Sequence, residues 1–191
     1  MNTDNSIEEE IRESLAAGNR AYHVHKELFI TKLIFRNVKL QLYNTLICPV
    51  VTYASETWVI KENLINKLMI FERKISKKLL GTTRTEDVYW RIKTNQEISD
   101  ILKEQNIIGF IKKQRLKWFG HVERMTEDNN LKKIKRWNPM SRRRKGRHKS
   151  RWEDDVSIDI KDMNLRNFRN LAQDRELWMT VVEQAKTLKS L

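Results

Sequence analysis

The sequence predicts an all-α protein, a helical bundle followed by a basic helical subdomain, on three observations. Apolar residues recur at three- and four-residue spacing over most of the 191 residues, which is the period of one helix face. Five glycines and two prolines are too few for the many turns of a β-sandwich or barrel. The positive charge gathers in one window of the chain, as expected for a subdomain with an exposed basic arm.

Residues 1–82 are predicted to form the helical bundle. An apolar repeat of four begins at Ile7, and Gly18 is expected to end that helix. Asn37 is a candidate N-cap for a later helix, which Pro49 would end or kink.

The end of the bundle carries the clearest helical period, in Lys61–Leu80. Gly81 follows it, where a left-handed residue commonly closes a helix. The preceding run Val50–Tyr53 favours a strand, although no partner strand is obvious.

Residues 83–137 are predicted to form a basic helical region. Thr94 and Glu97 have the spacing of a capping box, and Ile107–Met125 carries an apolar stripe. Residues 152–191 are predicted to form two helices. The first would follow a capping box of Ser150 and Glu153.

Residues 138–151 contain a proline, a glycine and a basic run with little to bury, so we interpret them as an exposed linker between the helical regions. The net charge of the chain is +13, and residues 111–152 contain 16 Lys and Arg against three Asp and Glu. Residues 1–110 have a net charge of +2 and residues 153–191 of −2. Such a surplus indicates a polyanionic partner, and we expect RNA, DNA or both.

A membrane partner is not expected, because no run of about 18 apolar residues could span a bilayer. The N-terminus lacks a signal-peptide pattern, and the lone Cys48 forms no internal disulfide. We therefore expect an intracellular protein of the nucleus, the cytoplasm or both.

Two basic elements are candidates for nucleic-acid contact, the helix Ile107–Met125 and the linker. Gly120 is interpreted as the point where a phosphate backbone could approach the helix. The candidate contacts are Lys113, Arg115, Lys117, His121 and Arg124 on the helix, Trp137 as a base-stacking residue, and Arg142, Arg143, Arg144, Lys145, Arg147, Lys149 and Arg151 on the linker. Alternatively, the helix presents a solvated charged face, and the linker only solubilises the chain or directs nuclear import. Trp118, Trp152 and Trp178 fall on apolar stripes and are expected in the core.

A catalytic centre is not predicted. Trp152–Asp155 reads Trp-Glu-Asp-Asp, which resembles the aromatic-x-Asp-Asp signature of magnesium-dependent polymerases. That chemistry needs a β-hairpin, whereas these acids fall in the first turn of a helix, where its dipole favours them. The spacing of His23, His25 and Cys48 fits no common metal motif. We expect no metal, no other cofactor and no small-molecule substrate for this chain.

Four segments carry a family resemblance. Leu42–Trp58 begins Leu-Tyr-Asn-Thr-Leu and ends Ala-Ser-Glu-Thr-Trp, and Arg115–Met125 contains Arg-Leu-x-Trp-x-Gly-His-x-x-Arg-Met. Arg142–Val156 is an arginine-rich run that ends Arg-Trp-x-Asp-Asp-Val, and Leu171–Trp178 follows it. In this order the segments resemble the region after the polymerase palm in reverse transcriptases of non-LTR retrotransposons, those of insects and other animals above all.

The resemblance implies that Ile7–Leu80 corresponds to the polymerase thumb, and the remainder to an extension that grips template RNA and target DNA. The palm, with its magnesium-binding aspartates, and any endonuclease domain would precede this chain. Mg²⁺ would then matter only if the chain were joined to that palm, its expected partner in a parent polyprotein. Three residues depart from the family: Ala54 replaces a usual Gly, Cys48 a usual Arg and His148 a usual Pro.

Our functional hypothesis is a nucleic-acid-binding C-terminal fragment of a non-LTR retrotransposon reverse transcriptase, which is not an enzyme by itself. Two alternatives stay open. One is a decayed retrotransposon reading frame without selected activity. The other is a recruited nuclear protein-interaction module whose basic run serves only nuclear import.

Overall fold

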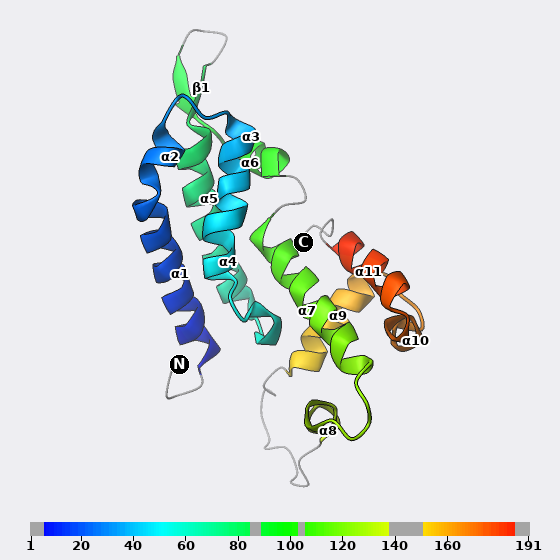
Figure 1. Ribbon diagram of the computed structural model, residues 1–191. Coiled ribbons are helices and arrows are strands. Elements are labelled where there is room, and N and C mark those ends of the chain that lie inside the picture. The colour runs from blue at the N-terminus through cyan, green and yellow to red at the C-terminus, as the bar shows by residue number, and fades with distance from the viewer. Residues whose placement is uncertain (1–5, 85–88, 103–105, 138–150, 186–191) are drawn as a thin grey trace. The chain divides into compact units, whose positions relative to one another are not determined.

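Helices make up most of the protein, so the predicted all-α fold is confirmed (Figure 1). The computed structural model describes residues 6–84, 89–102, 106–137 and 151–185. The strands in these ranges are β1 (Thr82–Arg84) and β2 (Trp90–Ile92), an antiparallel pair in which Thr83 lies opposite Arg91. None of the helices in these ranges is long and apolar enough to cross a bilayer.

The chain divides into two units. They comprise Met1–Ala54 with Ile60–Ile108, and Ser55–Val59 with Gly109–Leu191. The β1–β2 pair and the helix that follows it group with the first unit, and the domain boundaries expected from the sequence stay predictions. The linker expected at residues 138–151 lies outside the described residues, apart from Arg151.

The first unit is built around one long helix, α5, against which α1, α2, α3 and α6 pack. Its helical elements are α1 (Ile7–Val24), α2 (Lys26–Ile30), α3 (Arg36–Leu42), the π-helical turn η1 (Tyr43–Ile47), α4 (Cys48–Val51), α5 (Glu62–Leu80) and α6 (Asn95–Leu102). The apolar stripe predicted for α5 is buried, with Leu68 and Ile75 fully so. Burial of this stripe against its neighbours, more than helix propensity, holds such a unit together.

Gly18 lies inside α1, so the prediction that it ends the helix is wrong. A Cβ at this position would lie 2.3 Å from Cγ2 of Val51 and 3.0 Å from Cζ of Phe71. Glycine is therefore required for the close approach of α4 and α5 to α1. The helix continues because its buried face extends to Tyr22.

The segment after α2 also differs from prediction. Phe35, and not Asn37, occupies the N-cap of α3. Pro49 lies in the first turn of α4, directly after the π-helical turn. The helix ends two residues later, at Val51. The β-favouring run Val50–Tyr53 begins within α4 and forms no strand.

Ala54 adopts φ 56°, a left-handed conformation that strains any residue with a Cβ. Glycine would adopt this positive φ without the steric cost.

Two helix-boundary predictions are confirmed in this unit. Gly81 follows α5 with φ 66°. Before α6, the Thr94 hydroxyl accepts from the Glu97 N–H at 3.2 Å, and the Glu97 carboxylate accepts from the Thr94 N–H at 2.7 Å. Local sequence predicts such features well, because both partners lie within one turn.

Glu72 is a buried carboxyl group within the first unit, 4% exposed. It accepts a hydrogen bond of 2.8 Å from the N–H of Ile107, the first residue of α7 (Ile107–Glu123). Burial raises the pKa of Glu72 to about 7, against the lowering effects of this hydrogen bond and of Arg73. The folded protein therefore retains a proton on Glu72 at pH values where the unfolded chain has lost it.

Glu72→Gln is expected to flatten the dependence of stability on pH. In the native protein, the free energy of unfolding should fall as the pH rises from 4.5 to about 7, because the unfolded state binds fewer protons in this range. The glutamine amide keeps an oxygen for the Ile107 N–H and does not ionise, so at pH 8 the variant should be more stable by about 2 kcal/mol. Urea unfolding of both proteins between pH 5 and 8 measures this difference. Parallel pH curves for the two proteins would contradict the expectation.

The second unit places α7 at the centre of a second core. Its further helical elements are η2 (Ser55–Thr57), a 3-10 turn, α8 (Asn130–Arg136), α9 (Trp152–Asp162), α10 (Phe168–Gln173) and α11 (Arg175–Gln184). Leu116 and Phe119 of α7 pack with Trp178 and Val182 of α11 in this core. The Trp178 indole N–H donates to the Leu116 carbonyl at 2.8 Å, so the buried indole nitrogen is satisfied.

Helix starts in this unit are shifted from prediction. The box expected at Ser150 and Glu153 lies one residue later, where the Asp154 carboxylate accepts from the Arg151 N–H at 2.7 Å. Asp155, the next residue, lies on the buried face of α9. The sequence predicts one helix at the end of the chain, whereas the structure has two there, α10 and α11. Asp174 begins the second by accepting from the N–H groups of its first turn.

Candidate nucleic-acid interface

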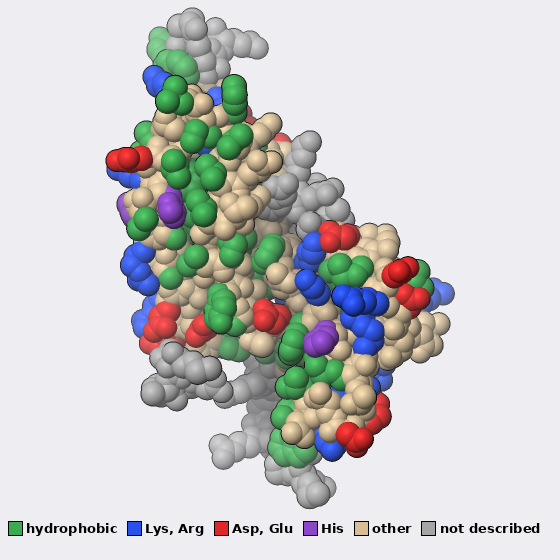
Figure 2. Space-filling view, viewed as in Figure 1, with side chains coloured by type: hydrophobic (Ala, Val, Ile, Leu, Met, Phe, Trp, Pro, Cys, Tyr) green, Lys and Arg blue, Asp and Glu red, His purple; other side chains and the backbone are tan. Residues whose placement is uncertain are grey.

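A hollow of about 510 Å³ lies in the second unit, between η2, α7 and α11. Its nine lining residues are Glu56, Gln114, Lys117, Trp118, His121, Arg124, Arg175, Trp178 and Met179. On the visible face of this unit, lysine and arginine side chains gather beside a histidine (Figure 2). We call this feature the basic hollow. Among the described residues, its lining includes three permanent cations and a single acid, Glu56.

Successive turns of α7 supply the cationic side of the basic hollow. Lys117 and His121 are four residues apart, so their exposed side chains lie on one face of the helix. Within the described residues, Lys117 forms no ion pair. The indole of Trp118 lies beside the imidazole of His121, with ring centroids 5.4 Å apart. The hollow therefore combines exposed charge with an aromatic surface.

Arg124 and Arg175 complete the basic hollow. The Arg124 guanidinium donates to the Ala172 carbonyl at 2.7 Å, which anchors it while its charge remains without an acidic partner in the described chain. Arg175 is the exposed first residue of α11. Arg175 was not predicted from the sequence, because it lies outside the basic window and reaches the hollow only through the packing of α11 on α7.

Arg115 was predicted as a nucleic-acid contact, but the structure places it inside the second unit with 5% exposure. Its Nη1 lies 2.8 Å from Oδ2 of Asp155, and its Nε lies 3.1 Å from Oδ2 of Asp159. A buried guanidinium held by two carboxylates has a structural role, so Arg115 does not contact nucleic acid as predicted. Arg115 is buried because α9, which supplies both acids, packs on its side of α7.

Lys113, another predicted contact, lies at the edge of the same region. Its Nζ is 2.5 Å from Oε1 of Glu183. Lys112 is paired in a similar way with Asp159 and Asp162, at 3.4 Å each. Acids of α9 and α11 thus neutralise part of the basic window. In the described part of α7 and the turn that follows it, the cations without an acidic partner are Lys117 and Arg124, with His121 beside them.

Gly120 does not provide an approach for a phosphate backbone, contrary to prediction. A Cβ at this position would lie 2.2 Å from Cδ1 and from Nε1 of Trp178. The missing side chain therefore makes room for an indole of the core.

The remaining predicted contacts have different placements. Arg142, Arg143, Arg144, Lys145, Arg147 and Lys149 lie outside the described residues. Arg151 is half-buried at the start of α9, and Trp137, at the end of α8, is 67% exposed. Of the tryptophans expected in the core, Trp178 is fully buried, whereas Trp118 and Trp152 are only half-buried.

The acidic cluster that resembles a polymerase signature serves local structure. The Asp154 carboxylate accepts a hydrogen bond from the Arg151 N–H at the start of α9. Asp155 pairs with Arg115, and Glu153 lies 4.0 Å from Nζ of Lys135. Within the described chain, no group of three or more His, Cys, Asp or Glu side chains could hold a metal ion. Burial raises the pKa of Cys48 to about 12, which disfavours the thiolate that a metal would need.

The fold and this site define an all-helical protein with a basic, partly aromatic hollow. The chain is 24% identical over 193 residues to an uncharacterized transposon-derived protein of Caenorhabditis elegans, an alignment that covers 98% of this chain and 68% of the relative. No protein-family profile and no solved structure matches the chain. The similarity indicates a transposon origin.

Proposed function

We propose that the second unit binds the sugar-phosphate backbone of RNA or DNA through the basic hollow. We further propose that the chain is the nucleic-acid-gripping, post-palm region of a non-LTR retrotransposon reverse transcriptase. The observation that carries the proposal is the convergence of Lys117, Arg124 and Arg175 on one hollow against the single acid Glu56. A phosphate backbone supplies the negative charge that such a cluster leaves unmatched.

The side chains of the basic hollow are suited to holding a nucleic-acid strand in place more than to recognising its base sequence. Lysine and arginine side chains that contact phosphates set register and affinity but do not discriminate bases. The proposed activity is therefore to hold a template or target strand, with polymerisation carried out by a catalytic palm elsewhere. The transposon-derived relative supports this context, and the motif Arg-Leu-x-Trp-x-Gly-His-x-x-Arg-Met supplies the link to reverse transcriptases.

Lys117→Ala with Arg175→Ala is expected to weaken RNA and DNA binding about tenfold at low salt, because two phosphate contacts are lost. The dependence of log affinity on log salt concentration should become shallower by about 2. Filter binding over a salt series measures both quantities.

The matched control is Lys133→Ala with Lys161→Ala, which removes the same charge from exposed positions outside the hollow. This control should leave most of the affinity in place. An equal loss in both double variants would show that net charge, and not the hollow, drives binding, and the proposed site would be abandoned.

Further variants and assays separate the alternatives. A decayed reading frame would bind weakly, with no loss on Lys117→Glu. A protein-interaction module would keep its nucleic-acid affinity after deletion of residues 142–151 and change only its location in the cell. A primer-extension assay with magnesium tests the absence of polymerase activity, since incorporation above background would contradict it.

A further inference from the structure

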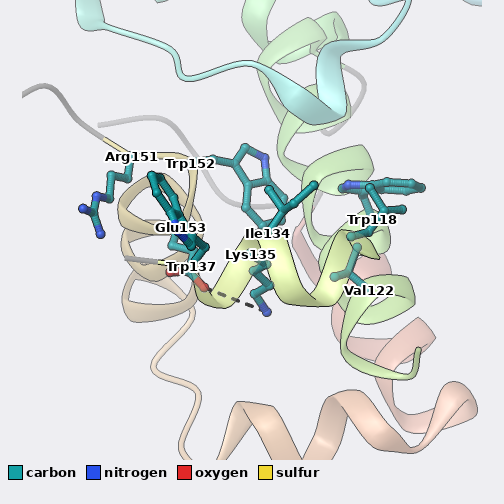
Figure 3. A pocket seen from close by; sticks show the side chains of 9 residues that line it. Trp118, Val122, Ile134, Lys135, Trp137, Arg151, Trp152 and Glu153 are labelled. Atoms are coloured by element: carbon teal, nitrogen blue, oxygen red, sulfur yellow. Dashed lines mark ion pairs between the residues drawn. The ribbon is translucent and has the colours of Figure 1, made fainter. Parts of the chain in front are cut away.

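A second concavity of the second unit, which we call the tryptophan groove, has an aromatic lining (Figure 3). It has a volume of about 350 Å³ and is lined by Trp118, Val122, Leu131, Ile134, Lys135, Trp137, Arg151, Trp152 and Glu153. Three indoles from three separate elements, α7, the end of α8 and the start of α9, thus border one groove. Exposed apolar groups gathered in this way commonly mark a binding site.

The indole rings of the groove differ in their contacts and exposure. Trp152 is held in place, since its indole N–H donates to the Glu56 carbonyl at 2.7 Å and its ring packs 6.4 Å from that of Phe119. Trp137 is 67% exposed, beside Ile134 at 69%. A fixed ring and an accessible ring at one groove offer flat surfaces to a flat ligand.

The tryptophan groove adjoins the basic hollow, because Trp118 lines both. The hollow carries cations without acidic partners in the described chain, whereas at the groove Lys135 pairs with Glu123 and lies 4.0 Å from Glu153, and Arg151 is half-buried. A ligand that spans both sites therefore needs an anionic part for the hollow and an uncharged, planar part for the groove.

We infer that the tryptophan groove receives unpaired bases of a single-stranded nucleic acid whose phosphates lie in the basic hollow. A nucleotide has this division into anionic backbone and planar base, and bases stack on aromatic side chains without sequence preference. The inference rests on the proposed function and adds the substrate class: a single strand, such as a template or a strand end. A duplex would fill the hollow alone, because its bases are stacked on one another.

The test compares three ligands of about 12 nucleotides, a length within the usual single-strand site size: oligothymidylate, an abasic oligomer and a duplex. Native protein should bind oligothymidylate about tenfold more tightly than the abasic oligomer. Trp137→Ala should remove this preference and leave the duplex affinity and the salt dependence unchanged, since no phosphate contact is lost. Trp137→Phe should recover part of the preference. Oligouridylate in place of oligothymidylate then reports whether RNA or DNA is favoured.

Trp90→Ala is the matched control, because Trp90 is 69% exposed on β2 of the first unit. The inference is overturned if abasic and base-bearing strands bind equally, or if Trp137→Ala weakens strand and duplex alike. It is also overturned if Trp137→Ala abolishes a dimer seen by sedimentation, since the groove would then hold a second copy. The proposed function fails separately, when Lys117→Ala with Arg175→Ala leaves the salt dependence of duplex binding unchanged.

Discussion

Arg115→Ala is expected to lower the free energy of unfolding by about 3–5 kcal/mol. The guanidinium lies within 3.1 Å of carboxylate oxygens of Asp155 and Asp159, and all three side chains are at most 10% exposed. Removal of the cation would leave two acids close together in a low-dielectric region, and their mutual repulsion adds to the cost of burial. Denaturant unfolding of native and variant protein measures the loss.

Burial already raises the pKa of Asp159 in spite of the lowering effect of Arg115 and Lys112. Without Arg115 this pKa should rise further. A raised folded-state pKa favours the folded protein at low pH, so the deficit of the variant should shrink as the pH falls toward the unfolded value. Asp155→Asn with Asp159→Asn, added to Arg115→Ala, should likewise recover part of the stability.

Lys117→Ala is the control on the same helix, and its exposed side chain should change stability by less than about 0.5 kcal/mol. The two variants therefore separate a structural cation from a proposed contact. If Arg115→Ala retained native stability and lost nucleic-acid affinity, the structural role assigned to Arg115 would be wrong, and its original interpretation as a contact would return.

Gly120→Ala is expected to destabilise the protein by about 3 kcal/mol, because the added methyl group overlaps a core indole. The new Cβ would lie 2.2 Å from two atoms of Trp178, whose N–H is also bonded to the Leu116 carbonyl. The sign of the stability change is diagnostic, since Gly→Ala inside an unhindered helix stabilises by about 1 kcal/mol. Thermal or urea unfolding checks the sign directly.

A double-mutant cycle isolates the contact between Gly120 and Trp178. Trp178→Leu alone should destabilise the core through lost packing. In that background Gly120→Ala should cost much less, because the shorter side chain leaves room for the methyl group. Equal costs of Gly120→Ala in the native and Trp178→Leu proteins would refute steric conflict with this indole.

Features that depend on neighbours in the sequence were predictable. The helical period of α5, the box of Thr94 and Glu97, and the terminating Gly81 all arise within one or two turns of chain. The physical cause is local: the apolar repeat of an amphipathic helix and its unsatisfied end groups are visible in sequence spacing. The sequence by itself thus determined the all-α class and the presence of a concentrated basic region.

Features that depend on partners remote in sequence were decided only by the tertiary structure. Gly18 and Gly120 resembled a helix stop and a ligand approach, yet each accommodates a distant side chain. Arg115 looked equivalent to Lys117 along the chain, but the packing of α9 on α7 buries the first against two acids and leaves the second exposed. Sequence records the number of charges, whereas the relative placement of helices determines which charges neutralise one another and which remain for a ligand.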